Sequence, residues 1–227
     1  MERTVQPELL DSLPHDHPDA RRGRRDLVLV NLLMGNPRWI VNTIRKVPEW
    51  RNAAIIELGA GDGHLCRALH HAFPDTPISA IDLAPRPASL PPAIQWHQGD
   101  LFAPPDAFPE IASRHLLIAN LFLHHFEAPA LAALGELVKN SVGIISVEPE
   151  RRALHIWQGR LISPLIGRAT RHDLPVSVRA GFQGTEIAKA FGLSQKNWLI
   201  QHSRTFFGAH RFHARPRILS HDAPPHA

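Results

Sequence analysis

A glycine-rich stretch near residue 60 constrains the fold of this chain more than any other feature. The apolar run of residues 54–58 contains one acid, Glu57, and is followed by Gly59, Gly61 and Gly63. Residues 64–73 then show the apolar spacing of a helix. A strand, a glycine turn and a helix in this order open many nucleotide-binding α/β sheets, where the glycines permit a tight turn and let a ligand approach the backbone.

The spacing of the glycines bears on the kind of ligand. A dinucleotide-binding turn has the pattern G-x-G-x-x-G, which requires glycine where this chain has His64. The pyrophosphate of a dinucleotide is bound by helix N–H groups. A ligand that carries ammonium and sulfonium cations instead of phosphate favours nearby carboxylates and carbonyls. The observed E-x-G-x-G-x-G pattern therefore favours a ligand without phosphate, and a purely structural glycine turn is the alternative.

The composition predicts one globular domain with terminal extensions. The chain has 227 residues, of which 44% are hydrophobic. Its single cysteine, Cys66, excludes an internal disulfide and is expected to be a packed core thiol on the first helix after the glycines. The sequence shows no N-terminal signal pattern and no long apolar span, so we expect a cytoplasmic protein without membrane contact.

The chain is basic, with a formal net charge of +4. This charge permits binding to nucleic acid, but the basic residues are scattered and aromatic residues are only 7% of the chain, so we expect no nucleic-acid partner. The 16 histidines do not show the spacing of metal ligands. His124 and His125 are adjacent and would point in different directions on a helix. We therefore expect no metal site.

Two further predicted strands end in an acidic residue. Residues 76–82 end at Asp82, about 20 residues beyond the glycine turn, where a ribose-binding carboxylate belongs in this topology. The next residue, Leu83, would offer an apolar face to an adenine ring. Residues 94–100 form a short strand that ends at Asp100 and is followed by Leu101. The alternatives are a capping or loop role for Asp82 and a simple Gly-Asp turn at Asp100.

Four segments, in order, resemble the motifs of class I S-adenosylmethionine (SAM) methyltransferases. The resemblance covers about residues 54–213. The glycine-rich stretch resembles motif I, and N-x-x-L-H-H-F at residues 120–126 resembles motif IV of small-molecule methyltransferases, including those of quinone and polyketide pathways. Segments between residues 148 and 182 (E-P-E-R, R-H-D and S-V-R-A-G-F) resemble a bacterial subfamily of such enzymes. The N-P-P-Y signature of many amino-group methyltransferases does not occur at motif IV.

The resemblance implies an α/β fold: a Rossmann-like sheet of seven strands in the order 3-2-1-4-5-7-6, with helices on both faces and an N-terminal helical extension. It also implies that Asp100 receives the adenine amino group and that the backbone N–H of Leu101 meets the ring. SAM is the implied cofactor. The residues predicted to bind it are Glu57, Gly59, Ala60, Gly61, Gly63, Asp82, Leu83, Asp100, Leu101 and Asn120.

The chain divides into three predicted parts. Residues 1–50 form a helical extension, with helices over residues 20–34 and 37–47, of the kind that often covers the cofactor in small-molecule methyltransferases. Residues 51–214 form the SAM-binding domain, with a substrate-side insertion at 150–183 that includes a long polar loop at 170–182. Residues 215–227 are expected to form a flexible tail.

Methyl transfer from SAM requires alignment of a nucleophile with an already activated methyl group, and a base where that nucleophile is a hydroxyl. His124, His125 and His172 are the predicted catalytic residues, the last beside Asp173, and Glu148 could shape the floor of the pocket. The favoured function is methylation of a small-molecule acceptor, on an oxygen of an aromatic or polyketide-like compound. An RNA methyltransferase and a non-catalytic SAM-binding partner protein are the alternatives.

Overall fold

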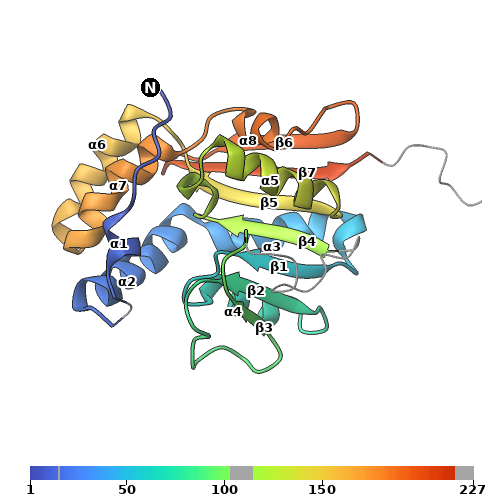
Figure 1. Cartoon of the computed structure of the whole chain (residues 1–227), viewed down its shortest axis with the longest axis horizontal. Coiled ribbons are helices and arrows are strands. Elements are labelled where there is room, and N and C mark those ends of the chain that lie inside the picture. Colours follow the sequence, from blue (N-terminus) through green and yellow to red (C-terminus); the bar gives the residue numbers. More distant parts are fainter. Residues whose placement is uncertain (15, 103–114, 218–227) are drawn as a thin grey trace, which may run out of the picture.

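A computed structural model describes residues 1–14, 16–102 and 115–217 of the chain (Figure 1). Seven strands of the described residues form one sheet in the order β3-β2-β1-β4-β5-β7-β6, which confirms the predicted order. The strands are β1 (Ala54–Leu58), β2 (Ile78–Asp82), β3 (Gln95–Gln98), β4 (His115–Asn120), β5 (Gly143–Pro149), β6 (Trp198–Arg204) and β7 (Ala209–Pro216).

The direction of the strands places one edge of the sheet where a site can form. The first five strands are parallel to one another, and the hairpin β6–β7 joins β5 in the antiparallel direction. The central strands β4 and β5 are almost wholly buried, because helices cover both faces of the sheet. The carboxyl ends of β1, β2, β4 and β5 therefore meet at one edge, where open α/β sheets bind their ligands.

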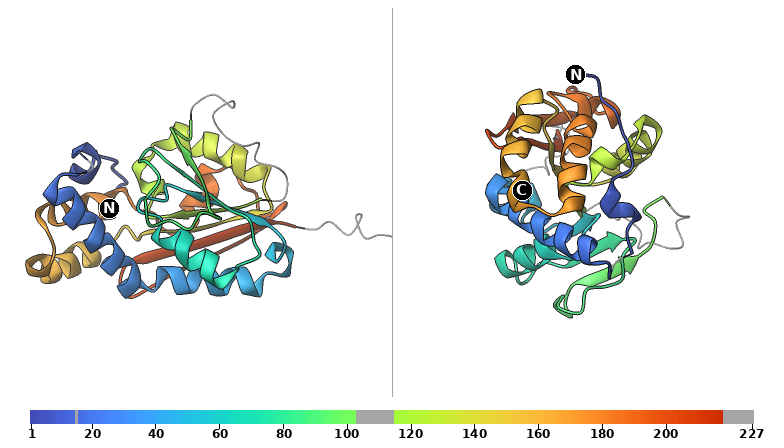
Figure 2. Two further views of the ribbon diagram at one scale, coloured as in Figure 1. Left: turned by 90° about the horizontal axis from the view of Figure 1, so that it is seen from below. Right: turned by 90° about the vertical axis from the view of Figure 1, so that its left-hand side faces the viewer.

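Helices pack on both faces of the sheet (Figure 2). On one face, α3 (Asn36–Lys46) and α4 (His64–Ala72) bury Ile40, Ile44 and Leu69 against β1, β2 and β4. On the other face lie α5 (Ala128–Lys139) and α8 (Glu186–Ala190). The helix-period apolar pattern after the glycines thus forms α4, as predicted. Cys66 is buried in this core, as expected for a packed thiol.

Four helices form a cap at the carboxyl edge of the sheet (Figures 1 and 2). They are α1 (Leu9–Ser12), α2 (Pro18–Met34), α6 (Ala153–Ile162) and α7 (Arg168–Ala180), and α7 packs against the other three. The buried carboxylate of Asp26 joins α2 to α7, because its Oδ2 accepts hydrogen bonds from the Gly167 N–H at 2.7 Å and the Thr170 hydroxyl at 2.9 Å. The N-terminal segment and the segment after β5 therefore build one structure. We name α1, α2, α6 and α7 the helical cap.

The predicted loop over residues 170–182 is wrong, because most of it is the helix α7. Pro175 and the polar residues of this segment indicated a loop, since proline removes one helical hydrogen bond. The helix persists because it buries one side, including Thr170, Asp173 and Val176, inside the helical cap. Burial of that side outweighs the weak local helix preference.

The remaining short elements among the described residues are the 3-10 turns η1 (Pro48–Trp50), η3 (Leu123–His125) and η4 (Ser163–Leu165). Arg215 and Pro216, which we expected in the tail, pair with β6 as the last residues of β7. Residues 218–227 of the expected tail lie outside the described residues. In the part of the chain that the structure describes, every helix is too short or too polar to span a lipid bilayer.

Candidate functional site

The glycine turn joins β1 to α4 and leaves one position of its backbone open. Gly59, Gly61 and Gly63 all have left-handed φ angles, of 67°, 54° and 69°, which favour glycine. A Cβ on Gly59 would lie 2.0 Å from the Phe122 ring, and one on Gly63 would lie 2.7 Å from Leu90. A Cβ on Gly61 would meet nothing within 4 Å. A ligand can therefore approach the backbone at Gly61, whereas side chains of the protein cover the other two glycines.

The carboxylate of Asp82 lies beside that opening, at the end of β2. Its Oδ2 accepts a hydrogen bond from the Gly61 N–H at 2.7 Å, and its Oδ1 accepts one from the Ala84 N–H at 2.8 Å. The residue is only half-buried. Each carboxylate oxygen has a second lone pair, so Asp82 can still accept hydrogen bonds from two hydroxyl groups.

Glu57, the acid of the glycine motif, faces the opposite way. It is buried, and its Oε2 accepts a hydrogen bond from the thiol of Cys66 in α4 at 2.7 Å. Burial, reinforced by the nearby charge of Asp82, raises the pKa of Glu57 to about 8. Glu57 therefore supports the glycine turn from the α4 side. Because its side chain is buried, it offers no exposed oxygen to a ligand. Ala60, also predicted to bind cofactor, is buried as well.

The other predicted cofactor residues lie at the same edge with different exposures. Leu83 is 72% exposed, and Leu101 is half-buried against the core of the α5 face. Asp100 is exposed, and its Oδ1 accepts a hydrogen bond from the Phe102 N–H at 2.9 Å. That contact is the turn that the sequence offered as the alternative to adenine binding. The Gly99 N–H donates to the Asp82 carbonyl at 2.9 Å, which brings the ends of β2 and β3 together.

Asn120, the last residue of β4, belongs to a group of three asparagines. Its Nδ2 donates to Oδ1 of Asn31 in α2 at 3.0 Å, and Nδ2 of Asn36 in α3 donates to the same oxygen at 2.8 Å. The side-chain oxygens of Asn120 and Asn36 are buried and have no hydrogen-bond partner among the described residues. The group connects the helical cap to the end of β4.

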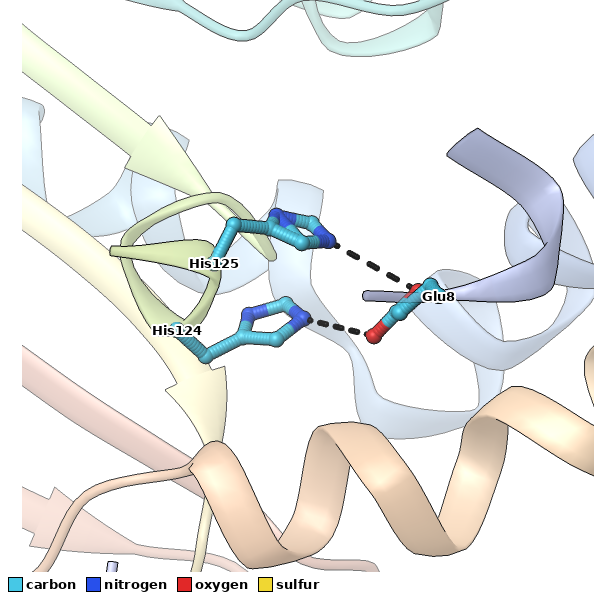
Figure 3. A group of neighbouring side chains, drawn as sticks. All are labelled: Glu8, His124 and His125. Carbon is cyan, nitrogen blue, oxygen red and sulfur yellow. Dashed lines mark hydrogen bonds and ion pairs between the residues drawn. The ribbon is translucent and has the colours of Figure 1, made fainter. Parts of the chain in front are cut away.

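The chain turns sharply after β4 and places two histidines side by side. Leu121 has a left-handed φ of 55°, a strained conformation for a bulky residue. The η3 turn that follows brings the imidazole rings of His124 and His125 to a centroid distance of 4.1 Å. Both rings point toward the carboxylate of Glu8, from the segment just before α1 (Figure 3). The expectation that adjacent histidines point apart is wrong here, because η3 is a single 3-10 turn and not an α-helix.

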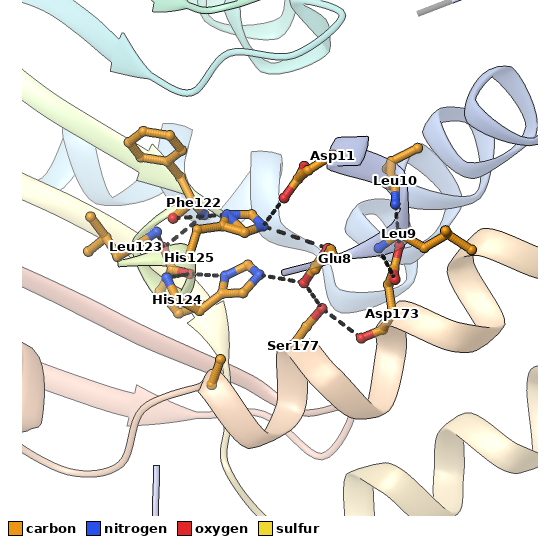
Figure 4. Close-up of polar contacts among 12 residues, drawn as sticks. Glu8, Leu9, Leu10, Asp11, Phe122, Leu123, His124, His125, Asp173 and Ser177 are labelled. Atoms are coloured by element: carbon orange, nitrogen blue, oxygen red, sulfur yellow. Dashed lines mark hydrogen bonds and ion pairs between the residues drawn. The ribbon is translucent and has the colours of Figure 1, made fainter. Parts of the chain in front are cut away.

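Hydrogen bonds hold His124 between two carboxylates (Figure 4). Its Nδ1 lies 2.8 Å from Oε2 of Glu148, and its Nε2 lies 3.3 Å from Oε1 of Glu8. The backbone N–H groups of Phe122, Leu123 and His124 also donate to Glu148. Glu148 at the end of β5 therefore fixes the whole η3 turn.

The carboxylates and the burial shift the protonation of the two rings in opposite directions. Burial alone lowers the pKa of His124, but the hydrogen bonds to Glu148 and Glu8 outweigh it and raise that pKa to about 9. Burial, together with the charge of His124, lowers the pKa of His125 to about 4. Burial and the charges of Glu8 and Asp173 raise the pKa of Asp11 to about 6. The carboxylates of Glu8, Glu148 and Asp11 thus face this pair of rings.

His172 lies apart from the two other predicted catalytic histidines. Its side chain is 57% exposed on α7, and its Nδ1 contacts Asp173 at 2.9 Å. Asp173 itself is buried and accepts hydrogen bonds from the N–H groups of Leu9 and Leu10 at 2.7 and 2.9 Å. This contact ties α1 to α7, so Asp173 positions the segment that carries Glu8.

Glu8, Asp11 and Ser177 belong to the site but had no signal in the sequence. Glu8 lies more than a hundred residues before the histidines, in a segment without a motif. The helical cap also reaches the glycine turn, because Nε of Arg24 in α2 lies 3.2 Å from Oδ1 of Asp62. Residues near the N-terminus therefore close over both parts of the site.

No family model matches the sequence, and no curated protein matches it. Solved structures match the fold. The plantazolicin methyltransferase BpumL with S-adenosylhomocysteine (SAH) has a TM-score of 0.66 at 12% identity, over 89% of this chain and 92% of BpumL. This chain has the fold of the class I methyltransferases.

Two further neighbours cover a similar share of this chain. Human N-acetylserotonin methyltransferase with SAM has a TM-score of 0.56 at 18% identity, over 90% of this chain and 60% of that protein. The pyocyanin biosynthetic protein PhzM has a TM-score of 0.54 at 16% identity, over 89% of this chain and 60% of PhzM. At these identities the likeness concerns the fold.

Proposed function

We propose that this protein transfers a methyl group from SAM to an oxygen atom of a small aromatic or polyketide-like molecule. The observation that carries the proposal is the open backbone at Gly61 beside the carboxylate of Asp82, at the carboxyl edge of a methyltransferase-type sheet. The neighbours in this fold include structures with SAM and with SAH.

The residues at the edge fit an adenosyl group without phosphate. Asp82 retains lone pairs for two ribose hydroxyls, and each charge-assisted hydrogen bond of that kind contributes about 1.5–3 kcal/mol. Leu83 and Leu101 offer apolar side chains, and Asp100 offers a carboxylate, where the adenine would lie. Gly59, Gly63 and Glu57 shape the turn from beneath, since protein side chains cover them.

The acceptor would lie between the glycine turn and the helical cap. Phe122 connects the two parts of the site, because its ring packs on Gly59 and its carbonyl oxygen lies 3.2 Å from Nδ1 of His125. The ring of Phe126 contacts the rings of Phe122 and Phe102 edge to face, at centroid distances of 4.8 and 5.2 Å. Aromatic rings of this kind favour an aromatic acceptor.

The chemistry requires alignment, loss of a proton and exclusion of water. An acceptor hydroxyl forms the new carbon–oxygen bond while the carbon–sulfur bond of SAM breaks, which releases SAH and one proton. Alignment of the two reactants is worth about 7–11 kcal/mol. The cluster of Glu8, His124 and His125 supplies the groups for proton removal, and the helical cap supplies cover. His172 is exposed, so its proposed part is contact with the acceptor.

Calorimetry with SAH tests the cofactor assignment. Asp82→Ala removes the proposed ribose acceptor, and we expect its affinity for SAH to fall more than tenfold. Asp75→Ala is the matched control, because Asp75 is an exposed aspartate before the same strand and should leave the affinity unchanged. Unchanged affinity in Asp82→Ala, or clear heat with NAD or ATP and none with SAH, would contradict the proposal.

Transfer of a labelled methyl group from SAM tests the acceptor class. We expect label to enter compounds of a small-molecule metabolite extract and to leave added RNA unlabelled. Label in RNA would support the RNA methyltransferase instead. Binding of SAH without transfer to either substrate would support a non-catalytic SAM-binding protein.

A further inference from the structure

Three side chains from two distant parts of the chain converge on one point beside the helical cap. The ligand-type atoms of Glu8, His124 and His125 all lie within 4.8 Å of one another. Nε2 of His124 lies 3.3 Å from one oxygen of Glu8, and Nε2 of His125 lies 3.6 Å from the other (Figure 3). The side chains of Glu8 and His124 are only 9% and 4% exposed, so this arrangement is built into the interior.

The outer nitrogen of each ring has a hydrogen-bond acceptor of its own. Nδ1 of His124 faces the carboxylate of Glu148 at 2.8 Å, and Nδ1 of His125 faces the carbonyl of Phe122 at 3.2 Å. A proton on each Nδ1 satisfies these acceptors, and an ion that displaces the proton between Nε2 of His124 and Glu8 would find a lone pair on each Nε2. Such contacts to a carboxylate and a carbonyl are the ones that orient histidine ligands in metal sites.

We propose that Glu8, His124 and His125 bind a divalent first-row transition metal ion such as zinc. Zinc–nitrogen distances of about 2.0–2.1 Å separate neighbouring ligands of a tetrahedral ion by about 3.3 Å, close to the spacings between Glu8 and the two rings. Two imidazoles and one carboxylate match the ligand preference of such ions, whereas magnesium prefers oxygen ligands alone.

The distances favour an ion over direct hydrogen bonds alone. Nε2 of His125 is buried and has no hydrogen-bond partner among the described residues, and 3.6 Å to Glu8 is too long for one. An oxygen of Asp11 lies 3.7 Å from the same nitrogen and adds a further carboxylate beside the three ligands. Ser177 donates a hydrogen bond to Oε1 of Glu8 and orients it (Figure 4). A cation balances the carboxylates that meet here.

The metal ion would also take part in the proposed methyl transfer. This step of the inference rests on the proposed function. An acceptor oxygen bound in an open position of the ion would lose its proton near neutral pH, since a bound divalent ion lowers the pKa of oxygen ligands. The oxygen then attacks the methyl group of SAM, and the proton leaves to solvent. His124 and His125 act as ligands in this scheme, and neither has to serve as the base.

Titration of the metal alone tests the site without reference to SAM. The full chain is purified without a histidine tag, treated with EDTA and titrated with zinc chloride by calorimetry. We expect one zinc ion per chain and no heat with magnesium chloride. Cobalt chloride should bind with the same stoichiometry and give visible absorption typical of nitrogen and oxygen ligands. Less than stoichiometric zinc binding, or cobalt bands typical of the hydrated ion, would overturn the proposal.

Variants distinguish this site from the other histidines of the chain. His125→Ala and Glu8→Gln should each weaken zinc binding at least tenfold, and circular dichroism verifies that they fold. His71→Ala is the matched control, because it removes an exposed histidine of α4 outside the cluster and should leave zinc affinity unchanged. Stoichiometric binding that survives His125→Ala and Glu8→Gln would place the ion elsewhere and reject the assignment. The cobalt spectrum of the unaltered chain decides the question if a variant fails to fold.

The outcome is separable from that of the cofactor proposal. Zinc binding without SAH binding would leave the metal site standing and reject the methyltransferase. SAH binding without zinc binding would reject the metal site and leave the methyltransferase standing. A histidine base would then account for loss of the acceptor proton.

Discussion

Burial controls the chemistry of Glu57 more than its place in the glycine motif does. The sequence pattern predicts a carboxylate near the cofactor, but the side chain packs inside and accepts a hydrogen bond from Cys66. Its neutral form is favoured, because the interior penalises a buried charge. At neutral pH the acid of motif I is therefore a hydrogen-bonded structural group.

Stability of the cofactor-free protein should depend on pH through Glu57. The folded pKa of about 8 lies above the unfolded value of 4.5, so the contribution of this group is full below pH 4.5 and is lost as the pH rises toward 8. Glu57→Gln carries no titration, so its stability relative to the unaltered chain should rise by up to about 1.4 kcal/mol per pH unit across this window. Urea unfolding at pH 5, 6, 7 and 8 measures the difference.

Glu136→Gln is the control for that experiment, because Glu136 is an exposed residue of α5. The stability difference between this variant and the unaltered chain should stay nearly constant over the same range. A Glu57→Gln curve that runs parallel to that of the unaltered chain from pH 5 to 8 would mean that Glu57 is ionised in the folded state.

Two helical glycines, Gly135 and Gly23, lie where their helices approach neighbouring segments closely. Gly135 lies in α5, and a Cβ there would come within 2.5 Å of the backbone oxygen of Phe191, just after α8. Gly23 lies in α2, and a Cβ there would meet the end of the flexible Leu10 side chain at 3.1 Å. Both glycines have helical neighbours, but only the first faces backbone atoms that cannot move aside cheaply.

The two glycines should therefore respond differently to alanine. We expect Gly135→Ala to destabilise the protein by about 1–3 kcal/mol, because α5 and α8 must move apart. Gly23→Ala should be neutral or stabilising by up to about 1 kcal/mol, since alanine is the better helix former. Chemical unfolding of the two variants side by side measures both effects. Equal losses would show that the approach of α5 to the Phe191 backbone does not exclude a methyl group at position 135.

The helix α7 illustrates the limit of local patterns at this scale. Pro175 and a polar composition predicted a loop, whereas contacts with α1, α2 and α6 stabilise a helix there. The strands and α4 were predictable, because their apolar residues repeat with a period that reports burial directly. Two partners of α7, the helices α1 and α2, come from the N-terminal end of the chain, and no local pattern reports them.

At the scale of the whole molecule, the N-terminal segment and the segment after β5 act together. Glu8 reaches His124, Asp26 reaches Thr170, and Arg24 reaches Asp62. The helices α1 and α2, from the predicted extension, and α6 and α7, from the predicted insertion, therefore form one helical cap over the carboxyl edge, whereas α3 packs on a face of the sheet (Figure 1). A ligand at this edge would contact groups from most of the chain.

Binding of SAH should accordingly stabilise the entire fold. At a hundred times its dissociation constant, a ligand that binds only the folded state adds about 2.7 kcal/mol. For a chain of this length we expect Tm to rise by about 5–10 °C in a thermal melt with SAH. Asp82→Ala at the same SAH concentration should show a smaller rise, and NAD should leave Tm unchanged. A Tm that does not respond to SAH would contradict the cofactor assignment.

The sequence by itself determined the strands, the glycine turn and the place of Asp82, because short-range patterns of apolar residues and glycine dictate them. The order of the strands was predicted from the resemblance to methyltransferase motifs and not from these patterns. Only the tertiary structure decided how His124 and His125 are arranged. The η3 turn aligns His124 with His125. The packing of α1 on α7 brings the carboxylate of Glu8 to face both rings. The physical reason is distance along the chain: local patterns report local geometry, whereas a site assembled from residues 8, 124, 125, 148 and 177 exists only once the helical cap has packed.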